Sequence, residues 1–169
     1  MATTLIQAQI ELWVLEAQAG DMDALARLYQ HFTPQVMGFV LKKTANTSLA
    51  QDAVQEAWIK LSKRLSRLDD PAAFKSWLFQ LAHWQVLDMA KQNARYAPAI
   101  EEQPQAQDTR AVDVADALTR LGTTEQEIIH LFYLEGFSLA EIGRILAIPT
   151  GTVKSRLFRA RKQLEQLLN

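Results

Sequence analysis

The sequence has no cysteine, and this absence excludes several kinds of site at once. A chain without thiols has no disulfide framework, no thiolate zinc site and no cysteine nucleophile. No apolar run approaches the roughly 20 residues needed to span a bilayer. Residues 1–9 also lack the basic and then apolar pattern of a signal peptide. We therefore expect a cytoplasmic protein with no membrane insertion.

Features that would support catalysis or ligand chemistry are scarce as well. The three histidines, His31, His83 and His130, show no paired ligand spacing, and no glycine-rich phosphate loop is present. The carboxylate pair Asp69-Asp70 has no partner base near it in the sequence. We expect no catalytic residue, no metal site and no cofactor, so an enzyme has little support.

Net charge is also small, at −1, which argues against a protein that coats nucleic acid non-specifically. It does not exclude local DNA binding, because the position of the charges decides that.

Apolar residues make up 49% of the chain, and most of them recur at helical spacing. No strand-like alternation of useful length and no internal repeat interrupts this pattern. The sequence therefore predicts an all-α fold with two small helical domains, residues 1–95 and 113–169. Residues 96–112 are polar and acidic and contain Pro98 and Pro104, which favours a flexible linker; an ordered surface loop is the alternative.

In the first domain the spacing predicts helices over residues 6–19, 22–32, 34–43, 49–65 and 72–93. Gly20 should end the first helix and Asp21 should cap the second, while Pro34 suits the start of a third. Ser48 with Gln51 forms a capping-box pattern. The second helix should bury five side chains: Met22, Leu25, Leu28, Tyr29 and Phe32.

In the second domain a helix carrying Val114, Leu118 and Leu121 comes first. Capping-box patterns then stand at Thr124 with Glu127 and at Ser138 with Glu141, and Gly136 should end the helix between them. The short turn 147–149 precedes a final helix that Thr150 should cap and that runs to about Leu168. A short helix, a turn and a longer helix predict a helix-turn-helix over residues 138–162.

The final helix has two contrasting faces. Apolar residues at Val153, Leu157, Ala160 and Leu164 follow spacings of four, three and four, which predicts a buried stripe. The opposite face carries Thr152, Ser155, Arg159 and Lys162, and residues 150–162 hold five cations and no acid. Although a charge run alone usually marks a solvated face, its place in a helix-turn-helix predicts contact with the DNA major groove.

Residues 137–143 (FSLAEIG) and 151–161 (GTVKSRLFRAR) closely resemble region 4.2 of extracytoplasmic-function (ECF) sigma factors, a group within the sigma-70 family. The resemblance implies that this region reads the −35 promoter element. The implied DNA-binding residues are Thr152, Lys154, Ser155, Arg156, Phe158 and Arg159. At the turn this chain has Ala147 where the family commonly has glycine; a left-handed backbone there costs alanine about 1 kcal/mol.

The first domain resembles region 2 of the same family. Residues 49–58 (LAQDAVQEAW) are similar to region 2.2, which implies docking on the β′ coiled coil of RNA polymerase through Asp52, Gln55, Glu56 and Trp58. Residues 74–84 (FKSWLFQLAHW) are similar to regions 2.3 and 2.4, which implies binding or melting of the −10 element. The residues implied there are Lys75, Trp77, Trp84, Asp88, Lys91 and Arg95.

Two aromatic residues of the −10 set have alternative roles. The spacing of Trp77 with Leu78 and Leu81 fits a core position as well as base stacking. Trp84 could line a base pocket or could be packed. His83-Trp84 also replaces an Arg-Asn pair that family members often have.

The resemblance as a whole implies a sigma factor that binds core RNA polymerase (β′ coiled coil and β flap) and directs promoter-specific initiation at −10 and −35 elements. It further implies an anti-sigma protein as a partner. The alternative is a stand-alone helix-turn-helix regulator with a helical N-terminal dimer or ligand domain, which would need a dimer seam to bind two half-sites.

Overall fold

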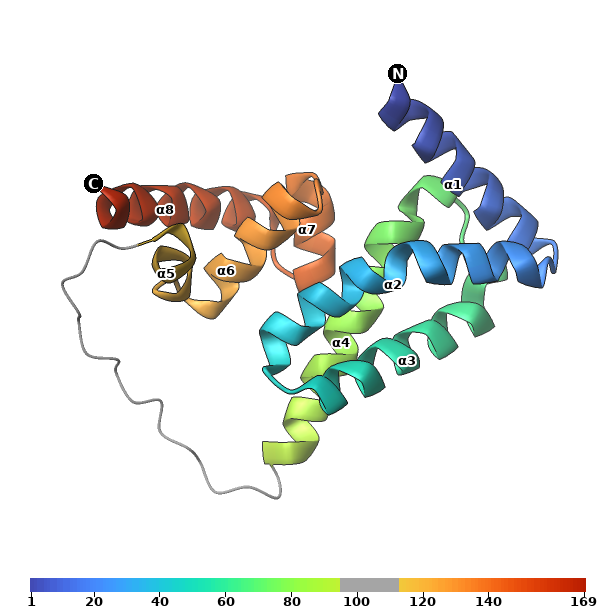
Figure 1. The fold of residues 1–169 in the computed structure, drawn as a ribbon, viewed down its shortest axis with the longest axis horizontal. Helices are drawn as coiled ribbons and strands as arrows, with labels where there is room; N and C mark the ends of the chain where they lie inside the picture. Colours follow the sequence, from blue (N-terminus) through green and yellow to red (C-terminus); the bar gives the residue numbers. More distant parts are fainter. Residues whose placement is uncertain (95–112) are drawn as a thin grey trace. The chain divides into compact units, whose positions relative to one another are not determined.

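The computed structural model describes residues 1–94 and 113–169, and every regular element in these two ranges is helical (Figure 1). The predicted all-α fold is confirmed. The chain divides into two compact units, Met1–Met89 and Ala90–Asn169. The predicted linker and Arg95 lie outside the described residues, and the predicted domain boundaries stay predictions. No helix in the described ranges is long and apolar enough to cross a membrane.

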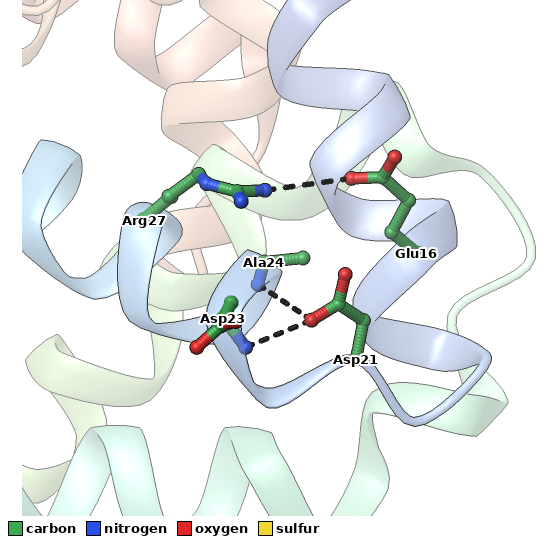
Figure 2. A network of polar contacts seen from close by, with 5 residues as sticks. All are labelled: Glu16, Asp21, Asp23, Ala24 and Arg27. Atoms are coloured by element: carbon green, nitrogen blue, oxygen red, sulfur yellow. Dashed lines mark hydrogen bonds and ion pairs between the residues drawn. The ribbon is translucent and has the colours of Figure 1, made fainter.

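The first unit is built from four α-helices and two 3₁₀ turns: α1 (Ala2–Gln18), α2 (Met22–Thr44), α3 (Thr47–Arg64), η1 (Leu65–Arg67), η2 (Pro71–Ala73) and α4 (Phe74–Ala94), whose last turn continues past Met89. The corner between α1 and α2 forms as expected. Gly20 has a φ of +99°, and the Asp21 carboxylate accepts hydrogen bonds from the backbone N–H groups of Asp23 (2.9 Å) and Ala24 (3.2 Å) (Figure 2). A pair between Arg27 and Glu16 at 3.8 Å joins the two helices there.

Helix α2 corrects the prediction of a boundary at Pro34. The chain forms one helix of 23 residues with Pro34 inside it. A proline inside a helix costs about 3 kcal/mol, because it removes one hydrogen bond and crowds the preceding turn. Here the apolar stripe continues on both sides of the proline, and Phe32, Val36 and Phe39 are all buried. Packing of that uninterrupted stripe offsets the local cost.

The start of α3 also differs from the expectation. Its cap is Asn46, whose side chain accepts a hydrogen bond from the Leu49 backbone N–H at 3.1 Å, and Ser48 already lies within the helix. The chain leaves α2 through Ala45, which adopts the left-handed conformation with φ +48°. Because this connection is short, the residue with extended backbone that caps α3 is Asn46. It lies two positions before Ser48, the cap that the capping-box pattern predicts.

Aromatic rings on α2 and α4 form much of the core of the first unit. The rings of Phe32 and Phe74 lie 5.6 Å apart, and those of Phe39 and Phe79 lie 5.5 Å apart. Leu28 and Phe32 are buried and Leu25 is half-buried, but Met22 and Tyr29 are 71% and 48% exposed, so the prediction that these two are buried is wrong. Tyr29 directly follows the buried Leu28, and neighbouring residues on a helix point about 100° apart.

The second unit contains α5 (Val114–Thr119), α6 (Thr123–Ile129), a π-helical turn η3 (His130–Leu134), α7 (Leu139–Leu146) and α8 (Thr150–Leu168). Gly136, with φ +72°, ends the α6–η3 segment as predicted. The capping box at Thr124 does not form, because Gly122 occupies the cap position without a side-chain bond. The predicted cap of α8 is also wrong: Thr150 is the first helical residue, and Pro149 precedes it.

Candidate nucleic-acid and partner interfaces

The connection between α7 and α8 has the close geometry of a helix-turn-helix. At the start of α7 the predicted capping box forms: the Ser138 hydroxyl accepts from the Glu141 N–H at 3.2 Å, and the Glu141 carboxylate accepts from the Ser138 N–H at 2.7 Å. At its end, Ala147 adopts the left-handed conformation with φ +55°, as expected for this turn. A Cβ on Gly143 would lie 2.8 Å from the Ile148 carbonyl oxygen. Only glycine allows the turn to approach α7 this closely.

Helix α8 presents the two faces that its sequence predicts. Val153, Leu157 and Ala160 are buried, and Leu164 is half-buried. The outward face carries Lys154, Ser155, Phe158 and Arg159, all exposed, with Phe158 at 58%. Thr152, one of the other two predicted contacts, is half-buried. The structure therefore leaves four of the six predicted −35 residues open along one helix.

Arg156 differs from the other predicted DNA contacts. It is half-buried, and its guanidinium donates to the Glu125 carboxylate of α6 at 3.0 Å. This pair stabilises α8 against α6 and neutralises a cation that the sequence assigns to the reading face. Arg161 is also engaged within the unit: it donates to the Tyr133 hydroxyl and lies over the Phe132 and Tyr133 rings. The open cations of α8 are therefore fewer than the sequence suggests.

In the first unit, three of the four predicted polymerase-docking residues lie on the surface of α3. Asp52, Gln55 and Glu56 are exposed, whereas Trp58 is only 6% exposed. The Trp58 ring lies 5.1 Å from Tyr29 and 6.1 Å from Phe74. A partner can therefore contact Trp58 only at the bottom of a surface depression.

That depression is a groove of about 470 Å³ between α2 and α3. It lies beside the docking residues, since Gln55 is part of its wall, and it is lined by Met22, Leu25, Ala26, Tyr29, Gln30, Gln55, Trp58, Ile59 and Ser62. Sequence reasoning missed this groove. The available signal was the pair Trp58-Ile59, because Ile59 lies at the edge of the apolar stripe of its helix and is 37% exposed beside the buried Trp58.

The predicted −10 residues separate into two groups on α4. At 100° per residue, Trp77, Trp84, Asp88 and Lys91 fall on one face, and Lys75 falls on the opposite side. Trp84 is 45% exposed, Asp88 and Lys91 are exposed, and Trp77 is half-buried. Trp84 is therefore not a packed core residue. Lys75 is half-buried with its ammonium 5.7 Å from the Phe79 ring centre, which removes it from the open face.

Two lysines on other helices bond to side chains of α4. The periodicity of the sequence does not predict which residue of α4 each lysine contacts. Lys60 on α3 donates to the Gln85 side chain at 2.6 Å, next to Trp84. Lys43 on α2 donates to Nδ1 of the buried His83 at 2.8 Å; an ammonium can only donate, so this ring nitrogen accepts. Burial, and then the charge of Lys43, lower the pKa of His83 from 6.5 to about 4. His83 is therefore neutral at pH 7.

Known proteins match both units. Residues 28–96 match the family model described as Sigma-70 region 2, and residues 111–164 match that described as Sigma-70, region 4. The chain is 30% identical over 156 residues to the ECF RNA polymerase sigma factor SigM of Mycobacterium tuberculosis, covering 89% of this chain and 80% of SigM. It is 28% identical to the ECF RNA polymerase sigma factor BldN of Streptomyces coelicolor, covering 92% of this chain and 64% of BldN.

Among solved structures, the chain resembles CnrH in its complex with the cytosolic domain of CnrY, with a TM-score of 0.68. The match covers 95% of this chain and 97% of that one at 22% identity, which supports the same fold.

Proposed function

Since the chain belongs to the ECF sigma factors of the sigma-70 family, we propose that its two units divide promoter recognition between duplex and opened DNA. As a sigma factor it directs promoter-specific initiation by RNA polymerase. A stand-alone regulator is not favoured, because the family matches extend over both units. The proposal gives the protein no catalytic role and puts it in the cytoplasm, with polymerase and promoter.

The outward face of α8 reads the −35 element in this proposal. The single observation that carries it is the exposure of Lys154, Ser155 and Arg159 opposite a buried apolar stripe. An α-helix fits the major groove, where Arg binds guanine edges, Lys binds guanine or phosphate, and a hydroxyl accepts or donates. Phe158 gives apolar contact to a thymine methyl group. Arg156 supports the helix through Glu125 and contributes less to DNA directly.

The open face of α4 holds the separated −10 strand. Trp84 offers an exposed ring on which an unpaired base can stack, and base–aromatic stacking contributes about 1–3 kcal/mol per base. Lys91 is on the same face and suits a phosphate, and Lys60 of α3 donates to Gln85, the residue that follows Trp84. Asp88 fits a base amino group. Trp77 and Lys75 act mainly in packing.

Core polymerase docks on the outer side of α3. Asp52, Gln55 and Glu56 supply polar and acidic contacts, and the neighbouring groove above Trp58 accepts an apolar side chain. A polar rim around an apolar centre is the usual composition of a protein interface. We assign this surface to the β′ coiled coil, and we assign the β flap to the second unit.

An anti-sigma protein is the third proposed partner. CnrH, which shares this fold, was solved with the cytosolic domain of CnrY. A protein that covers the α3 surface would compete directly with polymerase. Competition for one surface is enough to silence a factor whose own affinity for DNA is low.

Run-off transcription with core polymerase on a promoter library tests the −35 assignment. Arg159→Ala should weaken −35-dependent transcription by roughly 1–3 kcal/mol and relax preference at one or two base pairs. Arg161→Ala is the matched control, because it removes a cation of the same helix that is bound to Tyr133. An unchanged promoter profile for Arg159→Ala, or equal losses for both variants, would move the reading face elsewhere.

Titration of labelled core polymerase tests the docking assignment separately. Gln55→Ala combined with Glu56→Ala should reduce affinity about tenfold while the protein stays folded. Gln9→Ala with Glu11→Ala removes the same two side-chain types from α1 and should bind normally. If the α3 variant binds like the unmodified protein, the docking surface lies elsewhere. DNA binding with no polymerase association at micromolar concentration would instead favour the stand-alone regulator.

A further inference from the structure

Helix α1 carries an apolar surface that the proposed function does not use. Leu5, Ala8, Leu12 and Leu15 recur at spacings of three, four and three, and we call them the leucine stripe. All four are exposed, with Leu5 at 72%, Leu12 at 48% and Leu15 at 52%. Single exposed leucines are common on protein surfaces, but a continuous row along one helix is typical of an interaction site.

The other side of α1 already holds the helix in place. Ile10 and Val14 are buried, and α1 packs on α2 and on the two 3₁₀ turns. The Gln18 amide donates to the carbonyl oxygens of Leu65 (2.9 Å) and Leu68 (2.8 Å). At 100° per residue the leucine stripe points almost directly away from Ile10 and Val14. The stripe therefore lies on an anchored helix whose packing needs are met without it.

The charges beside the stripe indicate what covers it. Glu11 flanks one side and Glu16 the other, and residues 1–26 contain four carboxylates and no Lys or Arg. Figure 2 shows Glu16 extending from α1 toward Arg27, while Glu11 is bonded only to Gln7 of its own helix among the described contacts. A second copy of this helix would bring like charges together along the seam, which destabilises pairing.

We propose that the leucine stripe binds an amphipathic helix of another protein whose apolar face is flanked by Lys or Arg. Spacings of three and four residues suit knobs-into-holes packing of two helices, and a cationic flank complements Glu11, while Glu16 on the other side already pairs with Arg27. This surface lies on a different helix from the three surfaces proposed on α3, α4 and α8, so it provides a fourth attachment point. A regulator held there acts without displacing polymerase from α3.

A designed peptide pair tests the proposal on the full chain. The probe has three heptads with Leu at a and d and Lys at e and g, whose like charges keep it from pairing with itself. The reversed peptide has Glu at e and g. We expect micromolar binding of the Lys peptide, and about tenfold weaker binding of the Glu peptide, by fluorescence anisotropy.

Variants then locate the site. Leu12→Gln with Leu15→Gln should weaken the Lys peptide at least about tenfold, and Glu11→Lys should shift preference toward the Glu peptide. Leu168→Gln, at an exposed leucine of the second unit, is the control and should change nothing. Circular dichroism checks that each variant is folded.

Equal binding of both peptides, or full affinity in the double variant, would overturn the proposal. Self-association in sedimentation that the double variant abolishes would also overturn it, in favour of a second copy of the chain.

Discussion

The two units carry their proposed functions in different ways. In the second unit one helix, α8, holds both the buried stripe that fixes it and the exposed residues that read DNA. In the first unit the surfaces are assembled between helices, as in the α2–α3 groove and the Lys60–Gln85 contact. A reading helix can therefore be recognised from its own periodicity, whereas an assembled surface depends on tertiary packing that periodicity does not contain.

The strongest test of this comparison removes a core aromatic from the first unit. Phe39→Ala should lower the free energy of unfolding by about 3–5 kcal/mol, because Phe39 is 1% exposed and its ring packs on Phe79. All four tryptophans precede residue 90, so their fluorescence during urea unfolding reports the first unit. Leu87→Ala, at a residue that is 43% exposed, is the control and should cost under about 1 kcal/mol. Similar losses in both variants would mean that this core is loosely packed.

A smaller effect should come from closing the space at the turn of the second unit. Gly143→Ala places a Cβ against the Ile148 carbonyl and should destabilise α7 and α8 by about 1–3 kcal/mol. Gly38→Ala in α2 is the matched control: its Cβ meets nothing within 4 Å, so it should stabilise by about 0.5–1 kcal/mol. Hydrogen exchange of peptides from each helix measures both changes. A neutral result at Gly143 would show that the turn can shift without loss.

The first unit should also be sensitive to acid in a way that depends on His83. Its pKa is about 4 in the folded protein and 6.5 when unfolded, so between these values the unfolded chain binds more protons. Stability is then present above pH 6.5 and is lost as the pH falls, by about 1–2 kcal/mol between pH 7 and pH 5. His83→Gln removes this contribution. Urea unfolding of both proteins at the two pH values should differ by that amount, and parallel curves would contradict it.

The smallest predicted effects compare two alanines in left-handed conformations, one in each unit. Ala45 (φ +48°) ends α2, and Ala147 (φ +55°) ends α7. Glycine at either position should raise the free energy of unfolding by at most about 1 kcal/mol. It relieves the backbone strain of the left-handed conformation, but a chain with glycine loses more conformational entropy on folding. Differential scanning calorimetry measures both. A loss of stability at either site would mean that the alanine methyl group contributes packing that outweighs the strain.

The sequence predicted much of the fold, and it failed where tertiary contacts decide. The spacing of apolar residues correctly predicted the buried stripe of α8. Residue types typical of helix N-termini correctly predicted the Asp21 cap and the Ser138 capping box. The Pro34 boundary was wrong because packing on both sides outweighs a local cost.

The same limit applies to the candidate sites. The Arg156–Glu125 pair joins residues 31 positions apart, and no local pattern indicates it. Met22 and Tyr29 were predicted to be buried because both are apolar in an amphipathic helix. In the structure these two side chains line the groove together with Trp58 and Ile59 of α3. That contact between helices cannot be predicted from the pattern of α2 alone.

Trp58, at the floor of the groove, can report binding there through its fluorescence. The Trp58 indole N–H has no hydrogen-bond partner among the described residues, and only a sliver of its ring meets solvent. An apolar side chain that packs above the ring would exclude this remaining water. Its removal lowers the polarity around the indole and so shifts the emission wavelength. Occupancy of the groove can thus be followed without a label in a variant that keeps Trp58 as its only tryptophan, with any partner that lacks tryptophan.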